Sequence, residues 1–301
     1  MSFGLKFKCA LAAAGGVAAS LGIMLASVAN GPDRGITAIA GPLVVELQPG
    51  SVRYHAAGDF SRNGRPASPP KTTVSIRQPL VIMKYQVTAA EYQRCVEGHA
   101  CSPLDPGTTP ASDRPAVKIS WRDANSYADW LSARTGALYR LPTDEEWAYA
   151  AASRFQDEAL PDVDGGDPAQ LWLARYEMES SREGLIEKEP RSIGSYGANE
   201  NGLIDLAGNV WEWTSTCFVR QAIDANGQPI GTATTNCGVR VAEGRHRAYV
   251  PEFVRDVRSG GCMTGAPPAN LGFRLVRDGS RDRLRSLVES VQGFLSSVLV
   301  L

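Results

Sequence analysis

Three segments of the chain carry the pattern with which an amphipathic helix begins. In each, a hydroxyl residue is followed three positions later by an acid. These pairs are Thr88 and Glu91, Ser120 and Asp123, and Thr143 and Glu146. The hydroxyl can accept a backbone N–H of the first turn while the carboxylate reaches back to the cap residue. After the second start, apolar residues recur at helical spacing until Gly136. We therefore predict three helix starts, with the acids as caps rather than catalytic groups.

β-branched and alternating stretches predict strands before the first helix. Residues 43–47 predict a strand that ends at Pro49-Gly50, with residues 51–54 as its hairpin partner. Residues 72–84 return to β-branched side chains and predict further core strand. Residues 58–71 are rich in Pro, Gly, Arg and Ser and predict a surface loop, and residues 155–200 predict a long surface excursion.

The two ends of the chain differ from the middle. Lys6 and Lys8 precede an uncharged, Ala- and Gly-rich stretch over residues 10–29. This is the layout of a secretory signal, so residues 1–30 are predicted to be a cleaved signal peptide or an uncleaved signal anchor. Residues 280–301 carry an apolar stripe that predicts an amphipathic helix, packed on the protein itself or against a membrane or partner.

Composition and charge exclude some classes of protein. The chain has 301 residues, and 31 Lys and Arg against 32 Asp and Glu leave a net charge of −1, so no nucleic-acid partner is expected. Only three histidines occur, which excludes a His-rich metal centre. The 30 Gly and 19 Pro favour many loops and short elements, without an internal repeat.

Export changes the interpretation of the cysteines, because paired cysteines in an oxidising compartment are usually structural. Cys95 and Cys101 flank a short Gly-containing loop and are the first predicted disulfide. Cys217 and Cys237 close a polar loop and are the second. Cys262 is then left without a partner.

Five stretches together resemble the formylglycine-generating-enzyme, or sulfatase-modifying-factor, domain family. They are Tyr85–Tyr92, Val117–Trp121, Tyr139–Ala151, Asn201–Thr214 and Asn270–Arg274, in the family's order within residues 42–278. The resemblance implies an α+β fold related to C-type lectins, loop-rich and with few regular elements.

The resemblance is weakest where the family performs its chemistry. Active members hold copper with two cysteines ahead of the closing motif, and counting back from Asn270 places Pro251 and Asp256 at those positions. Neither side chain can be a soft thiolate ligand for copper(I), so copper is not expected. Cys262, in a Gly-rich stretch, has no second cysteine near it in sequence.

Two functions from different classes follow. The first is a non-catalytic, exported accessory protein that assists maturation or assembly of a protein partner. It is expected to be free in the periplasm or anchored to the inner membrane by residues 10–29. It resembles NirV-type accessory proteins of copper nitrite reductase systems and PvdO-type proteins of pyoverdine maturation. The alternative is an oxidase of altered chemistry that uses Cys262 on a protein or small-molecule substrate.

The resemblance also implies a structural calcium site. The corresponding donors here are the side chains of Asp205, Asn209 and Glu212 and the carbonyls of Gly208 and Val210. Calcium takes six to eight oxygen ligands, which a Gly-containing turn can bring together. Trp211 and Trp213 alternate around Glu212, so the segment can bury aromatic area on one side and present a carboxylate on the other.

Overall fold

A computed structural model describes residues 38–104, 112–156, 189–256 and 270–279. The chain divides into two units, Met1–Ala38 and Ile39–Leu301, and every element below belongs to the second. The predicted signal segment 1–30, the C-terminal segment 280–301 and Cys262 lie outside the described residues. Within the described ranges, no helix has the length and apolar character needed to cross a membrane.

All three predicted helix starts are confirmed. Helix α2 spans Ala89–Glu97, α3 spans Trp121–Thr135 and α4 spans Asp144–Ala151, followed by a 3₁₀ turn at Ala152–Arg154. Each begins at its predicted hydroxyl residue with a complete capping box. Helix α3 ends at Gly136, whose φ of 76° is a left-handed conformation that costs glycine little.

A four-stranded sheet holds the N-terminal strand of the domain. Its order is β1 (Val44–Leu47), β6 (Leu80–Met83), β12 (Val276–Asp278) and β7 (Leu138–Arg140). The predicted hairpin between residues 43–47 and 51–54 is wrong. Strand β1 pairs with β6, and β2 (Gly50–His55) pairs with β5 (Lys71–Ile76) in a separate two-stranded sheet. Local alternation predicted the strands, but long-range pairing decided their partners.

The predicted surface loop at 58–71 also contains regular structure. Strands β3 (Asp59–Arg62) and β4 (Arg65–Ala67) form a hairpin there. Its two turn residues, Asn63 and Gly64, have φ values of 53° and 74°. Asn-Gly is the preferred sequence for such a turn, because both positions need positive φ. The signal was present in the sequence.

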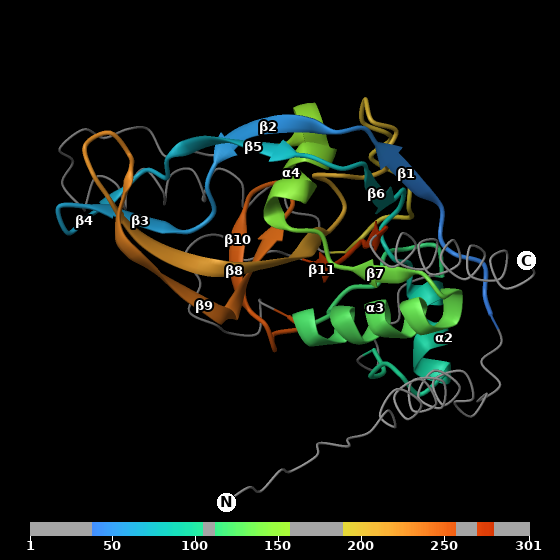
Figure 1. Ribbon diagram of the computed structural model, residues 1–301. Helices are drawn as coiled ribbons and strands as arrows, with labels where there is room; N and C mark the ends of the chain where they lie inside the picture. The colour runs from blue at the N-terminus through green and yellow to red at the C-terminus, as the bar shows by residue number, and fades with distance from the viewer. Residues whose placement is uncertain (1–37, 105–111, 157–188, 257–269, 280–301) are drawn as a thin grey trace, which may run out of the picture. The chain divides into compact units, whose positions relative to one another are not determined.

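The largest sheet has the order β10, β9, β8, β3, β4, with β11 (Leu271–Gly272) beside β8. Strands β8 (Trp211–Ile223) and β9 (Pro229–Glu243) form a long hairpin, and β10 (Ala248–Pro251) borders β9. The hairpin extends away from α2 and α3 toward β3 and β4 (Figure 1). Helix α4 packs against β2, β8 and β9.

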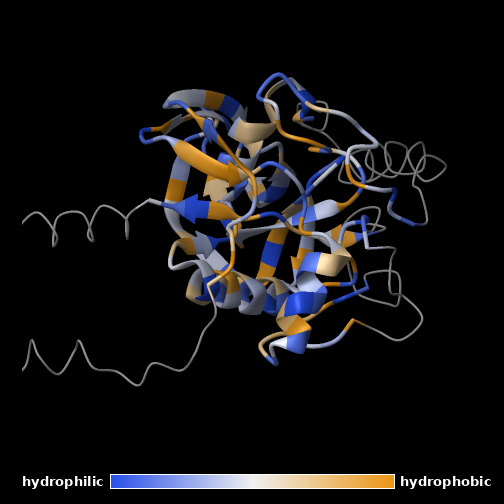
Figure 2. Cartoon of the chain, turned by 90° about the vertical axis from the view of Figure 1, so that its right-hand side faces the viewer, coloured by the Kyte–Doolittle hydropathy of each residue, from blue (hydrophilic) through white to orange (hydrophobic). Residues whose placement is uncertain are grey.

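Two hydrophobic clusters form the core of the described residues. One joins α2 and α3 to the large sheet and includes Tyr92, Tyr127, Trp213 and Phe273. The other lies under α4 and includes Ile82, Trp147 and Leu203. Hydrophobic and hydrophilic stretches alternate along the strands and helices that bound these clusters (Figure 2). Arg274 and Glu212 are fully buried between them.

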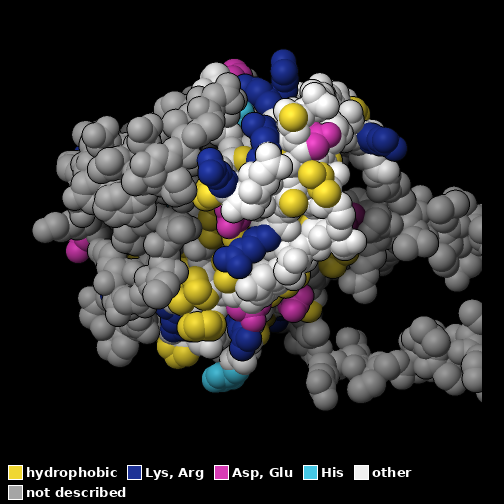
Figure 3. Space-filling view, turned by 90° about the vertical axis from the view of Figure 1, so that its left-hand side faces the viewer, with side chains coloured by type: hydrophobic (Ala, Val, Ile, Leu, Met, Phe, Trp, Pro, Cys, Tyr) yellow, Lys and Arg dark blue, Asp and Glu magenta, His cyan; other side chains and the backbone are white. Residues whose placement is uncertain are grey.

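The face at the left of Figure 1 shows how surface charge is distributed over the described residues. Lys and Arg side chains are spread among hydrophobic and polar atoms there rather than gathered in one patch (Figure 3). Leu43, Ile230 and Phe253 are the large hydrophobic side chains that are exposed in the described part of the chain. They lie on different segments and are isolated in sequence.

Candidate functional site

The carboxylate of Glu212 is the centre of a buried polar network. Glu212 lies at the start of β8 between Trp211 and Trp213, which alternate to the other side and pack into the core. Its two oxygens accept bonds from Arg274 Nε at 2.6 Å and Nη2 at 2.8 Å. Trp147 Nε1 and Gln86 Nε2 donate to the same carboxylate at 2.9 and 2.8 Å. The predicted carboxylate therefore faces the protein interior.

The turn before β8 is held by the other predicted donors. Asp205 and Asn209 both have positive φ, 59° and 65°. The carboxylate of Asp205 accepts from the backbone N–H groups of Gly194 and Tyr196 at 2.6 and 2.8 Å. The Asn209 amide bonds both backbone groups of Arg191. These side chains tie residues 191–196 to the turn.

The predicted calcium ligands do not fit one coordination shell as the structure places them. Glu212 pairs with Arg274, and the side chains of Asp205 and Asn209 are hydrogen-bonded to backbone groups. Gln86 Nε2 lies 3.2 Å from the Gly208 carbonyl and 3.4 Å from that of Asp205, besides its bond to Glu212. An amide nitrogen and a cation compete for these oxygens. The described ranges also contain no metal-binding cluster of three or more His, Cys, Asp or Glu side chains, which is a different kind of site from the predicted one.

A second buried charge cluster lies beside the first. Glu243 at the end of β9 accepts a bond from Arg247 Nε at 2.7 Å. Arg247 Nη2 also reaches Asp144 at 3.4 Å, and Nη1 donates to the His55 carbonyl. Burial raises the pKa of Glu243 well above its usual value, and Asp144 adds to the rise while Arg247 opposes it. The Arg247 guanidinium is therefore shared between two buried carboxylates.

The two positions at which the family places the copper-binding cysteines are occupied here by residues without a thiol. Pro251 ends β10, where its partner across the sheet is Val239. The carboxylate of Asp256 lies 3.6 Å from Lys118 Nζ. A proline ring and a paired carboxylate cannot replace two thiolates. Cys262 lies outside the described residues.

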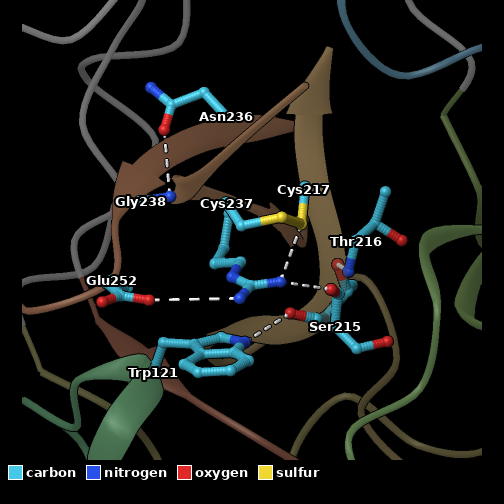
Figure 4. Close-up of a disulfide and its surroundings, with 10 residues drawn as sticks. Trp121, Ser215, Thr216, Cys217, Asn236, Cys237, Gly238 and Glu252 are labelled. Atoms are coloured by element: carbon cyan, nitrogen blue, oxygen red, sulfur yellow. Dashed lines mark hydrogen bonds and ion pairs between the residues drawn. A yellow bond between two sulfur atoms is a disulfide. The ribbon is translucent and has the colours of Figure 1, made fainter. Parts of the chain in front are cut away.

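Both predicted disulfides are present. Cys95 in α2 is bonded to Cys101, and both are buried against the core. Cys217 in β8 is bonded to Cys237 in β9 (Figure 4). Cys217 is partly buried, whereas Cys237 is exposed. The two bonds therefore differ in their access to solvent.

A guanidinium lies against the second disulfide. Arg240 Nη1 is 3.0 Å from Cys217 Sγ and 2.8 Å from the Ser215 carbonyl. The guanidinium stacks 3.9 Å above the Trp121 ring, and Nη2 is 4.0 Å from Glu252 (Figure 4). Burial lowers the pKa of Arg240 from its usual value, and Glu252 opposes this change. Arg240 Nε is buried without a hydrogen-bond partner among the described residues.

A cavity of about 590 Å³ opens beside the four-stranded sheet. Its charged walls include Arg140, Glu145, Glu146 and Asp278. Arg140 bonds both oxygens of Glu146, at 2.7 and 2.6 Å, and lies 3.5 Å from Asp278. Its described lining contains no Cys or His, so it offers no thiolate or imidazole for catalysis.

Three residues of these sites, Gln86, Arg240 and Arg247, were not predicted from the sequence. Gln86 lies inside the first family-like stretch, but nothing in its neighbours indicates that it reaches Gly208 and Glu212. Arg240 stands three positions after Cys237 in the printed sequence, which was an available signal. Which sulfur it contacts depends on the pairing of β8 with β9.

Comparison with known proteins identifies the family. The chain matches the Sulfatase-modifying factor enzyme 1-like domain over residues 37–279. It belongs to this family. The sulfatase-modifying-factor fold, with a few helices and mostly strands and loops, is therefore confirmed.

Curated relatives in the family include active and inactive proteins. The chain is 32% identical over 184 residues to the formylglycine-generating enzyme of Streptomyces coelicolor, which covers 55% of this chain and 53% of that protein. It is 31% identical over 173 residues to inactive C-alpha-formylglycine-generating enzyme 2 of Bos taurus, covering 56% and 51%. The matches span about half the length of these relatives. PvdO from Pseudomonas aeruginosa is a similar solved structure, with 21% identity, a TM-score of 0.49, and coverage of 79% of this chain and 94% of that one.

Proposed function

We propose that this chain is an exported accessory protein of the sulfatase-modifying-factor family that assists a protein partner without generating formylglycine. The observation that carries the proposal is the chemistry at Pro251 and Asp256. The first is part of the β9–β10 ladder and the second pairs with Lys118. Copper(I) prefers soft thiolate or thioether ligands, and neither residue supplies one.

Two further observations support an accessory role outside the cytoplasm. Relatives about as similar as the active enzymes include proteins named as inactive members, from Bos taurus and Mus musculus. Two disulfides in one chain favour an oxidising compartment such as the periplasm. The partner we propose is a protein in that compartment or at the membrane, with a copper nitrite reductase system as the specific case. Residues 10–29 or 280–301 provide the proposed membrane contact.

Mass spectrometry of a sulfatase-motif peptide tests the proposal. The oxidised full chain is incubated with the peptide, copper(I) and oxygen, beside the Streptomyces coelicolor enzyme as a positive control. We expect the control to convert the peptide thiol to formylglycine and this chain to leave it intact. Copper-dependent loss of the thiol that disappears in Cys262→Ser would overturn the proposal in favour of an altered oxidase.

A further inference from the structure

We propose that the Cys217–Cys237 disulfide is a thiol–disulfide exchange site, in which Cys237 is the attacked sulfur and Cys217 the leaving thiolate. The inference goes beyond the proposed accessory function and stands on the geometry of β8 and β9. Its ligand class is a thiol, from a partner protein or a small molecule. The formylglycine assay and the exchange assay below therefore fail independently.

The two sulfurs are unequal in access. Cys237 is exposed, and Cys217 is partly buried with its sulfur beside Arg240. We therefore assign Cys237, the more exposed of the two cysteines, as the site that an incoming thiolate attacks. Access and the identity of the leaving sulfur both govern the rate of this reaction.

The leaving sulfur has a cation in place to receive its charge. Arg240 Nη1 already lies 3.0 Å from Cys217 Sγ. Guanidinium groups beside a cysteine lower the pKa of its thiol, and a thiol of lower pKa leaves faster. Arg240 is held there by the Ser215 carbonyl and the Trp121 ring. The cation that would stabilise the Cys217 thiolate is therefore already in place while the disulfide is intact.

The backbone at Cys237 can tolerate an open bond. Cys217 of β8 pairs with Arg240, whereas the next residue, Phe218, pairs with Asn236, so residues 237–239 fall in a shift of register. Gly238 N donates instead to the Asn236 side chain at 3.0 Å (Figure 4). The Gly238 carbonyl accepts a hydrogen bond from Glu252 N. β-Bulges of this kind re-aim side chains and are frequent next to active sites. Cleaving the disulfide breaks no backbone pair between β8 and β9 in this register.

The reaction balances without another oxidant. A thiolate of the partner attacks Cys237 Sγ, the bond to Cys217 breaks, and its electron pair stays on Cys217 as a thiolate. A second thiolate of a partner dithiol then attacks the mixed disulfide and releases Cys237, which takes a proton from water. Two electrons pass from the dithiol to this chain, the partner gains a disulfide, and Cys217 and Cys237 are reduced.

The buried disulfide of the same chain is the internal control. Cys95 and Cys101 lie in the core cluster of α2 and α3, and the structure records no cation beside either sulfur in the described residues. The oxidised full chain is equilibrated with graded ratios of reduced to oxidised glutathione, alkylated and mapped by mass spectrometry. We expect Cys217–Cys237 to open at ratios that leave Cys95–Cys101 bonded. Opening of both bonds together, or of neither before unfolding, would overturn the proposal.

A second arm distinguishes the sources of the thiol. A peptide with a Cys-x-x-Cys dithiol replaces glutathione, and its conversion to a disulfide is counted against newly alkylated Cys217 and Cys237. Stoichiometric conversion supports a protein dithiol as the partner. Opening by glutathione without conversion of the dithiol peptide supports a low-molecular-weight thiol. Reaction with neither contradicts exchange.

Arg240 variants test the role of the cation. Arg240→Gln is expected to lower the equilibrium constant for reduction about tenfold, which corresponds to about 30 mV for this two-electron couple. Arg240→Lys keeps the charge and is expected to recover most of the loss. The thiolate absorbance of Cys237→Ser, combined with Cys9→Ser and Cys262→Ser so that Cys217 is the one thiol outside the Cys95–Cys101 disulfide, gives the pKa of Cys217. We expect a value below the ordinary value of about 8.5 that rises when Arg240→Gln is added. An unchanged pKa would show that Arg240 only supports the fold.

Discussion

Two buried glutamates lie side by side in adjacent strands and have different electrostatic surroundings. Glu212 of β8 and Glu243 of β9 are register partners and are 0% and 1% exposed. Glu212 has Arg274 to itself, and all five N–H donors of that guanidinium are used, two on Glu212 and three on backbone carbonyls. Glu243 shares Arg247 with Asp144.

The balance of charges around a buried acid, more than its depth of burial, decides how costly its ionised form is. A carboxylate removed from water is costly unless an opposite charge and hydrogen bonds replace the water. Glu212 has both. Around Glu243 and Asp144 there is one positive charge for two negative ones, which is consistent with the raised pKa of Glu243. The two equally buried glutamates should therefore respond differently to mutation.

Removing Arg274 should have the largest effect. Arg274→Met leaves Glu212 buried without its cation, and we expect a loss of about 3–5 kcal/mol in the free energy of unfolding. Urea denaturation at neutral pH measures the loss. Arg277→Met, three residues further along the chain in β12 and only partly buried, is the control and should cost far less. Similar losses in the two variants would show that the Glu212–Arg274 pair is not a major contribution to the free energy of unfolding.

Adding a carboxylate at Gln86 should unbalance the same network. Gln86→Glu places an acid next to Glu212, and we expect a loss of about 1–3 kcal/mol from the lost hydrogen bonds and the repulsion. Added calcium should restore the stability of this variant, because the cation would take the place of the amide donor between the carboxylates. Melting curves with calcium and with chelator measure both effects. We expect the wild type to be indifferent to either addition; a melting temperature that falls with chelator would instead support the structural calcium implied by the family.

Asp123 is a third acid with its own arginine, Arg255. Burial raises the pKa of Asp123, but hydrogen bonds from Arg255 and Ser120 outweigh burial and hold the pKa below its usual 3.8. A lowered folded-state pKa stabilises the fold above the unfolded value and loses that contribution as pH falls through the folded one. Asp123→Asn should cost about 1–2 kcal/mol at neutral pH. The cost should shrink below pH 3.8 in chemical denaturation, and a constant cost would contradict it.

Glu243→Gln should have the smallest effect at neutral pH and the opposite pH dependence. The raised folded-state pKa means that the fold is favoured below the unfolded value, about 4.5, and loses that contribution as pH rises through the folded value. An amide replaces the acid without a charge, so we expect a change within about 1 kcal/mol. Melting temperatures measured from pH 4.5 upward should decline less steeply in the variant than in the wild type. Glu97→Gln, on the exposed end of α2, is the control and should leave the slope unchanged.

Local signals were enough for the helices, the disulfides and the family. Capping boxes and helical spacing depend on residues within a few positions of each other, and each predicted start is the observed one. Cys95 and Cys101 are close in sequence, so their pairing also needed little knowledge of the fold. The Asn63-Gly64 turn between β3 and β4 is an equally local signal, although a loop was predicted there.

The sequence by itself determined the family, the helix starts, both disulfides and the missing thiolates at Pro251 and Asp256. Only the tertiary structure decided which charges meet. Glu212 meets Arg274 across 62 residues, and β1 pairs with β6 rather than with β2. The Arg240 guanidinium meets Cys217 rather than Cys237 because a register shift sets β8 against β9. Charge pairing and strand pairing depend on distances between remote segments, and no spacing along the chain contains those distances.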